Sequence, residues 1–117
     1  MEKLPQDFKE KWIAALRSGE FEQGRNALCR VYGIADKSYC CLGVAYRVFM
    51  GEDPYDTASG YIDGRIREGA ILKGFPEILT GTTAKSDVVK SLVLMNDGVG
   101  DTTKSFSEIA DYIEANL

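Results

Sequence analysis

Residues 41–50, Cys-Leu-Gly-Val-Ala-Tyr-Arg-Val-Phe-Met, are apolar on nearly every side, and this segment constrains the fold more than any other. A segment of this kind is either a buried central helix or a buried strand, because every face needs an apolar neighbour. Its length and the glycine that follows, Gly51, favour a helix that ends in a left-handed cap. We therefore predict a central helix around which the rest of the chain packs.

Two amphipathic segments supply helices that can cover it. Residues 5–18 repeat Phe8, Trp12 and Leu16 at helical spacing, so Trp12 is expected to anchor this helix in the core. Residues 105–117 open with the capping-box pattern Ser-x-x-Glu, in which a hydroxyl and a carboxylate satisfy each other's backbone N–H groups. An apolar stripe at helical spacing follows, which makes this the most clearly predicted helix of the chain.

Four shorter segments complete the predicted secondary structure. Residues 27–32 and 37–40 fit a short strand and its partner, and residues 66–72 fit a further strand. Residues 88–95 fit a helix, with a strand as the main alternative because three valines fall there. The predicted fold is a mostly helical α+β single domain spanning residues 1–117, with about four helices and a short β-hairpin or small antiparallel sheet.

Length and charge limit the functions that the chain can have. A chain of 117 residues suits one domain, and its 14 basic and 18 acidic side chains give a formal charge of −4. Because there is no histidine, a Ser-His-Asp triad, a Cys-His dyad and a histidine zinc site are excluded from this chain. The acidic balance argues against direct nucleic-acid binding, which phosphate contacts dominate. No metal site and no cofactor are predicted.

Three sequence features point to a cytoplasmic protein. No run approaches about 20 consecutive apolar residues, so neither a membrane span nor a membrane partner is expected. The first 20 residues alternate charged and apolar side chains and lack the apolar core of a signal peptide. The three cysteines are an odd number and suit a reducing compartment.

The pair Cys40 and Cys41 is the most unusual candidate for chemistry. A cysteine at a helix start lies at the positive end of the helix dipole, which lowers the pKa of the thiol and makes it nucleophilic. The missing histidine removes the usual base for such a nucleophile. The competing interpretation, which we favour, is that both cysteines are small buried apolar residues. We therefore assign no catalytic residue.

Candidate binding residues are spread along the chain. Arg17 and Arg25 could bind an anion with Tyr39 stacking beside it, although isolated surface arginines are usually only solvated. Asn96 and Asp97 could bond the polar edge of a ligand, or simply form a turn and a helix C-cap. The candidate ligand-binding set is Arg17, Arg25, Tyr39, Cys41, Asn96 and Asp97.

Four blocks of sequence form an ordered set that resembles a known group of proteins. They are Trp12–Gly19 with Gln23-Gly24, Tyr39–Val44, Met95–Asp97 and Ser105–Glu114. The set resembles small proteins encoded by bacteriophages and prophages, and its most distinctive parts are the Tyr-Cys-Cys-Leu-Gly block and the terminal Phe-x-Glu-Ile-Ala-Asp block. No catalytic residues are established for that group. The resemblance implies a phage accessory protein, a class that often acts as inhibitor, decoy or sponge against host enzymes and defence systems.

Three functional hypotheses follow. The first is non-catalytic binding by a small phage-type counter-defence protein, which inhibits a host defence protein or sequesters a small anionic, nucleotide-like signal. The acidic C-terminal half and a long polar loop at residues 51–66 support it. The second is a cysteine-dependent enzyme with Cys40 or Cys41 as nucleophile, and the third is an assembly module that forms a homo-oligomer. The missing base favours binding over catalysis.

Overall fold

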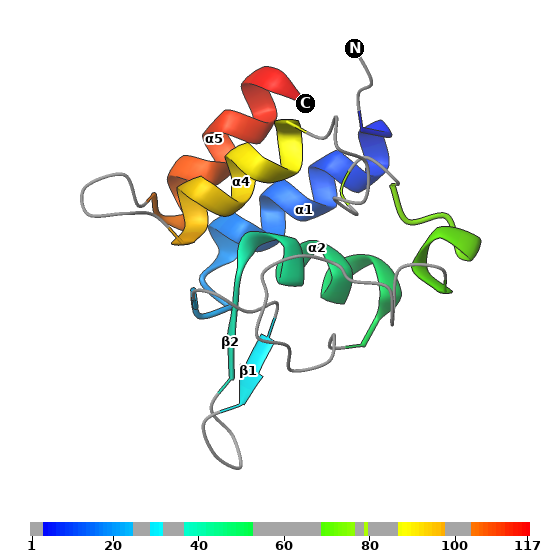
Figure 1. Ribbon diagram of the computed structural model, residues 1–117, viewed down its shortest axis with the longest axis horizontal. Coiled ribbons are helices and arrows are strands. Elements are labelled where there is room, and N and C mark those ends of the chain that lie inside the picture. The colour runs from blue at the N-terminus through cyan, green and yellow to red at the C-terminus, as the bar shows by residue number, and fades with distance from the viewer. Residues whose placement is uncertain are drawn as a thin grey trace.

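Four helices and a two-stranded antiparallel hairpin make up most of the described chain (Figure 1). The computed structural model describes residues 4–24, 29–31, 37–52, 69–76, 79, 87–97 and 104–117. The elements are α1 (Gln6–Ser18), β1 (Cys29–Val31), β2 (Lys37–Tyr39), α2 (Cys41–Met50), α4 (Asp87–Asp97) and α5 (Phe106–Asn116). The predicted mostly helical α+β class is thus confirmed.

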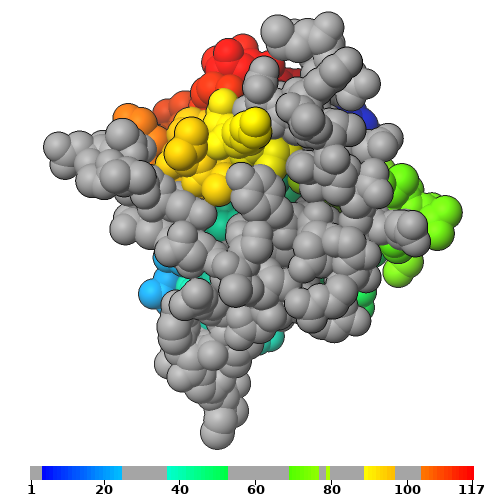
Figure 2. All heavy atoms as spheres, in the orientation of Figure 1, coloured from blue at the N-terminus to red at the C-terminus, as the bar shows by residue number. Residues whose placement is uncertain are grey.

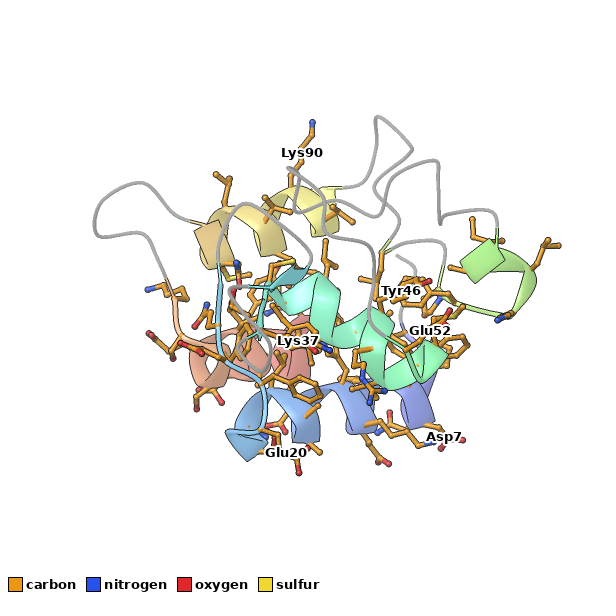
Figure 3. The ribbon with its side chains drawn as sticks, turned by 90° about the horizontal axis from the view of Figure 1, so that it is seen from below. Asp7, Glu20, Lys37, Tyr46, Glu52 and Lys90 are labelled. Carbon is orange, nitrogen blue, oxygen red and sulfur yellow. The ribbon has the colours of Figure 1, made fainter. Side chains whose placement is uncertain are left out.

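The central helix predicted from the apolar segment is α2. Every residue from Cys41 to Tyr46 is buried, and the helix ends at Gly51, whose φ of 76° gives the left-handed cap expected there. α2 packs against α1 and α4, while α5 also packs against α1 and α4. Each helix therefore has two helical neighbours, and one apolar core lies between the four (Figures 1 and 3).

α1 and α5 form as their sequences predict. Trp12 is fully buried in α1, and Gly19 ends that helix with a φ of 80°. At the start of α5, the Ser105 hydroxyl accepts from the Glu108 backbone N–H at 3.2 Å. The Glu108 carboxylate in turn accepts from the Ser105 N–H at 3.1 Å, which completes the capping box. The apolar stripes of both helices face the shared core, because α1 and α5 pack directly against each other.

The strand predicted at residues 66–72 is wrong for the part that the structure describes, because residues 69–72 form a helical turn. Ala70 and Phe75 face the core, and the Phe75 N–H donates to the Ala70 carbonyl at 2.9 Å, closing the turn. Leu72, which the strand needed as an apolar member, is 88% exposed. Two apolar residues in sequence, Ile71 and Leu72, suggested a strand, but the buried positions do not alternate.

Residues 88–95 belong to α4 and are helical, which decides between the two alternatives left open by the sequence. Val89, Leu92 and Asn96 are buried at helical spacing on one face. Lys90 and Leu94 lie on the exposed side. The valines therefore serve a helix here, since packing against α2 and α5 outweighs their strand preference.

The two predicted strands form, and β2 has partners on both sides. It pairs with β1 in antiparallel register, with Cys29 opposite Tyr39. On its other side the Gly24 N–H donates to the Tyr39 carbonyl at 2.7 Å, and the Tyr39 N–H donates to the Glu22 carbonyl at 2.8 Å. β2 thus positions the segment before β1 next to the start of α2.

The described molecule is slightly elongated, with extents of 38 × 31 × 26 Å. Figure 2 shows one face, which α4 and the segment 69–76 reach at separate places. In none of the described ranges does a helix have the length and apolarity needed to cross a membrane.

Candidate functional site

Asn96, one of the candidate binding residues, is completely buried near the end of α4. Its side-chain oxygen accepts hydrogen bonds from the Cys41 backbone N–H at 3.1 Å and from Gln23 Nε2 at 3.2 Å. Its amide nitrogen donates to the Gly24 carbonyl at 2.8 Å. One side chain thus joins α4, the first turn of α2 and the segment before β1, and these bonds offset the desolvation of a buried amide.

Gln23 extends these hydrogen bonds to α5. Its Nε2 also donates to the Lys104 carbonyl at 2.8 Å, and its Oε1 accepts from the Phe106 N–H at 3.1 Å. On the other side, Trp12 Nε1 donates to the Cys41 carbonyl at 2.9 Å. We call these bonded groups the Asn96 network. It contains members of all four sequence blocks, which gives the blocks a structural role.

Cys40 and Cys41 are buried, with 2% and 0% of their surface exposed. The Cys40 thiol caps α2 by accepting from the Gly43 N–H at 3.4 Å, and the Cys41 thiol donates to the Leu92 carbonyl at 3.7 Å. A nucleophilic cysteine needs a thiolate that a substrate can reach. Both side chains instead occupy buried positions in the fold, as favoured above, and their burial gives the enzyme hypothesis no support.

Arg17 lies at the surface and is bound by two carboxylates of α5. Its Nη2 contacts Asp111 Oδ1 at 2.7 Å, and its Nη1 contacts Glu114 Oε2 at 3.2 Å. The hydrogen bond to Asp111, followed by the one to Glu114, raises the pKa of Arg17 above its ordinary value. An anionic ligand would have to displace both carboxylates, so Arg17 is poorly placed to bind one.

The remaining candidates do not complete an open site. Tyr39 is buried, and its ring stands edge-on to Phe21 at a centroid distance of 5.1 Å, so it offers no exposed face for stacking. Arg25 and the side chain of Asp97 lie outside the described residues. Within the ranges that the structure describes, no group of three or more histidine, cysteine or acidic side chains could hold a metal ion.

A concave site lies elsewhere, between α1, the end of α2 and the residues around Pro76. This α1–α2 pocket has a volume of about 350 Å³. Its apolar lining consists of Pro5, Phe8, Val48, Phe49 and Pro76. Figure 3 shows Asp7 projecting from the N-terminal end of α1, at the same end of the molecule as Glu52, which follows α2. Pockets of this size and lining are the usual form of a binding site.

The floor of the α1–α2 pocket contains the aromatic rings of Phe8 and Phe49, and the buried ring of Phe75 packs against both of them. The pairwise centroid distances of these three rings are 5.6, 5.7 and 5.6 Å. Two of the three pairs are edge-to-face, a geometry that favours aromatic contact and holds the rings in place. A Cβ added at Gly74 would lie 3.7 Å from Phe49 Cζ, so glycine leaves this side of the Phe49 ring uncovered.

Two opposite charges stand at the rim of this pocket. Asp7 and Lys11 both line it, are exposed and lie one helical turn apart on α1. Neither forms an ion pair with another residue of the described chain. Among its described residues, the pocket thus combines an apolar floor with one carboxylate and one ammonium group that form no ion pair with other described residues.

A second hollow, of about 330 Å³, lies between α1 and α5. The cationic side chains among its described lining residues are Lys9 and Arg17. Lys9 Nζ donates to the Glu114 carbonyl at 3.1 Å, and Arg17 is held by Asp111 and Glu114. Because both cations are already bonded, this hollow is the weaker candidate for a binding site.

The sequence did not indicate the α1–α2 pocket. Phe8 was predicted as part of a helix stripe, and Phe49 as the end of the central apolar helix, and both expectations place them in the core. How much of the Phe8 and Phe49 rings faces the pocket depends on where residues 74–76 pack against α1 and α2. No local sequence pattern predicts that packing. The glycine and proline at 74 and 76 are the only local signals of a turn there.

The sequence profile of a domain of unknown function, DUF8296, matches residues 4–65. This range contains α1, the hairpin and α2, and hence both helices of the α1–α2 pocket. No significant match was found among curated proteins or among solved structures. Because the matched residues make up more than half of its 117 residues, the chain belongs to the DUF8296 family.

Proposed function

We propose that the protein is a small phage-type accessory protein that acts in the host cytoplasm by non-catalytic binding of a host defence protein. The observation that carries this proposal is the burial of the Cys40 and Cys41 thiols and of the Asn96 amide in hydrogen-bonded positions. The thiols considered as nucleophiles thus have structural partners, and so does the amide considered for ligand binding. This favours binding as the mode of action, and the resemblance of the four blocks supplies the phage context.

The α1–α2 pocket supports a protein partner better than a nucleotide-like signal. Its lining is mostly apolar, and among the described lining residues the one cation is Lys11, which lies one helical turn from the carboxylate of Asp7. Phosphate sites instead gather several cations or backbone N–H groups around the anion. Arg17, the described arginine of the candidate set, is already held by two carboxylates. Inhibition of a host protein is therefore preferred to ligand sequestration.

The acidic face of α5 gives less support than the pocket. Glu108, Asp111 and Glu114 are exposed and could imitate the charge of a nucleic acid. However, Glu108 accepts from Ser105, and the other two carboxylates bind Arg17. Their charge is partly compensated within the chain, so apolar contact is the better-supported mode of binding.

A plating assay tests this function. Bacteria that carry one of a panel of defence systems are infected with a phage that the system restricts, while the protein is expressed at graded levels. We expect plating to be restored for at least one system, with full restoration only when the protein reaches about the molar amount of its target. An enzyme would restore plating at far lower amounts, because it turns over.

Two variants serve as controls in this assay. Cys40→Ser keeps a helix-capping side chain but removes the thiol, and Lys90→Glu changes an exposed charge on α4. Both variants should restore plating as the wild type does. Failure to restore plating with every system tested would refute the proposal, and loss of the effect in a folded Cys40→Ser protein would support the enzyme hypothesis instead.

A further inference from the structure

The α1–α2 pocket has two oppositely charged side chains, Asp7 and Lys11, beside its apolar floor. We propose that the pocket binds a protein segment that inserts one aromatic or large aliphatic side chain between a basic residue facing Asp7 and an acidic residue facing Lys11. This inference rests on the proposed function, because it names the chemistry by which the bound protein is recognised.

The floor fits one large apolar side chain. Phe8 is only 7% exposed and packs against Phe49 and Phe75, so the ring positions are set by the fold before anything binds. A volume of about 350 Å³ accommodates a single side chain of this class better than a long segment. Anchor side chains that enter such preformed pockets commonly dominate the affinity of protein interfaces.

The two charges at the rim of the pocket determine which residues can flank the anchor side chain. Asp7 and Lys11 lie one turn apart on α1, and the ion pairs of the described chain involve neither of them. A segment with one basic and one acidic residue beside its anchor can satisfy both charges. A segment with two like charges satisfies one and repels the other, so charge complementarity distinguishes between these segments.

The same rim disfavours other ligands. A phosphate or an acidic membrane surface would meet the Asp7 carboxylate as well as Lys11, and the described residues that line the pocket include no second cation. An apolar molecule without charges would leave both rim groups unused. The mixed rim together with the apolar floor therefore points to a peptide segment of mixed charge.

Binding is measured by NMR titration of the full chain with four acetylated tripeptide amides at millimolar concentrations. Their sequences are Lys-Trp-Glu, Lys-Trp-Lys, Glu-Trp-Glu and the anchor-free Lys-Ala-Glu. We expect the tryptophan peptides to shift the backbone amide signals of Phe8, Phe49 and Gly74. The mixed peptide should bind about two- to fivefold more tightly than either like-charged peptide, as expected for exposed ion pairs. Lys-Ala-Glu should cause no shifts at these residues.

Charge variants of the rim test the assignment of each flank. Lys11→Glu should transfer the preference to Lys-Trp-Lys, and Asp7→Lys should transfer it to Glu-Trp-Glu. The neutral variants Asp7→Asn and Lys11→Gln should lower the discrimination without reversing it, and they serve if a charge reversal disturbs the helix. The matched control is Lys90→Glu, which makes the same charge change as Lys11→Glu. Lys90 projects from α4 on the opposite side of the molecule from α1 (Figure 3) and should leave the ranking unchanged.

Several outcomes would overturn the inference. These are equal affinity for all three tryptophan peptides, shifts that map away from the pocket, no binding of any peptide, and equal binding of the anchor-free peptide. A dimer detected by sedimentation and abolished by Asp7→Lys would assign the pocket to a second copy of this chain, and would overturn it too. None of these results affects the plating assay, so the inference can fail while the proposed function stands. Conversely, absence of restored plating with an intact peptide ranking would refute the proposed function alone.

Discussion

The side-chain oxygen of Asn96 accepts a hydrogen bond from the backbone N–H of Cys41 at 3.1 Å, so a residue near the end of α4 satisfies the first turn of α2. N–H groups in a first helical turn have no partner within their own helix. Because Cys41 is fully buried, this N–H is removed from bulk solvent. Asn96 therefore supplies a cap from a distant part of the chain.

Replacing Asn96 should strongly destabilise the fold. Asn96→Ala removes the acceptor of the Cys41 N–H and the donor to the Gly24 carbonyl, and it leaves a cavity where the amide was. We expect the free energy of unfolding to fall by about 2–4 kcal/mol, since unpaired buried groups carry their full desolvation cost. Urea denaturation followed by Trp12 fluorescence measures the change, because Trp12 belongs to the same network.

The control lies on the same helix. Lys90 is exposed on α4, so Lys90→Ala should change the free energy of unfolding by less than about 0.5 kcal/mol. If Asn96→Ala costs no more than Lys90→Ala, the Asn96 network does not hold the helices together as described.

The thiol group of Cys40 should be replaceable by a hydroxyl group but not by a hydrogen atom. Its sulfur accepts from the Gly43 N–H at 3.4 Å, and serine is a better N-cap than cysteine. We expect Cys40→Ser to be more stable than Cys40→Ala by about 1 kcal/mol in thermal or urea unfolding. Equal stability of the two variants would mean that the cap bond contributes nothing.

Much of the fold followed from local patterns. The stripe of Phe8, Trp12 and Leu16, the Ser105–Glu108 capping box and the glycines at 19 and 51 each depend on neighbours within a few positions. The strand prediction at residues 69–72 was wrong because it rested on two adjacent apolar residues, Ile71 and Leu72. The sequence alone does not show which of the two is buried. The orientation of this turn depends on the packing of Phe75 against Phe8 and Phe49, which are distant in the sequence.

The candidate site was much less predictable, because its contacts join distant residues. Asn96 gave a local signal for a helix end, and its role as the cap of α2 depends on a residue 55 positions away. From the sequence, Arg17 is interpreted as a solvated or anion-binding arginine. In the structure, α5 places Asp111 and Glu114 against it. Distances of this kind are set by packing, which a single sequence does not show.

The buried thiols should react slowly. In a Cys29→Ser background, Cys40 and Cys41 are the remaining cysteines, with 2% and 0% exposure. We expect their reaction with an aromatic disulfide reagent to be limited by opening of the fold, and to become fast in denaturant. Rapid reaction of one thiol in the native protein would contradict this and revive the enzyme hypothesis. A variant with all three cysteines replaced by serine gives the background rate.

Close packing of Gly24 against β2 gives the last prediction. A Cβ at Gly24 would collide with Ser38 Oγ and lie 2.8 Å from Ser38 Cβ, so Gly24→Ala should cost about 1–3 kcal/mol. Among the described residues, Ser38 Oγ is buried without a hydrogen-bond partner, so Ser38→Ala alone should be neutral or stabilising by up to about 1 kcal/mol. Combining Gly24→Ala with Ser38→Gly removes both colliding atoms. The double variant should therefore lose less stability than the two single changes added together. Strict additivity in urea unfolding would show that Gly24 and β2 do not meet as closely as the structure places them.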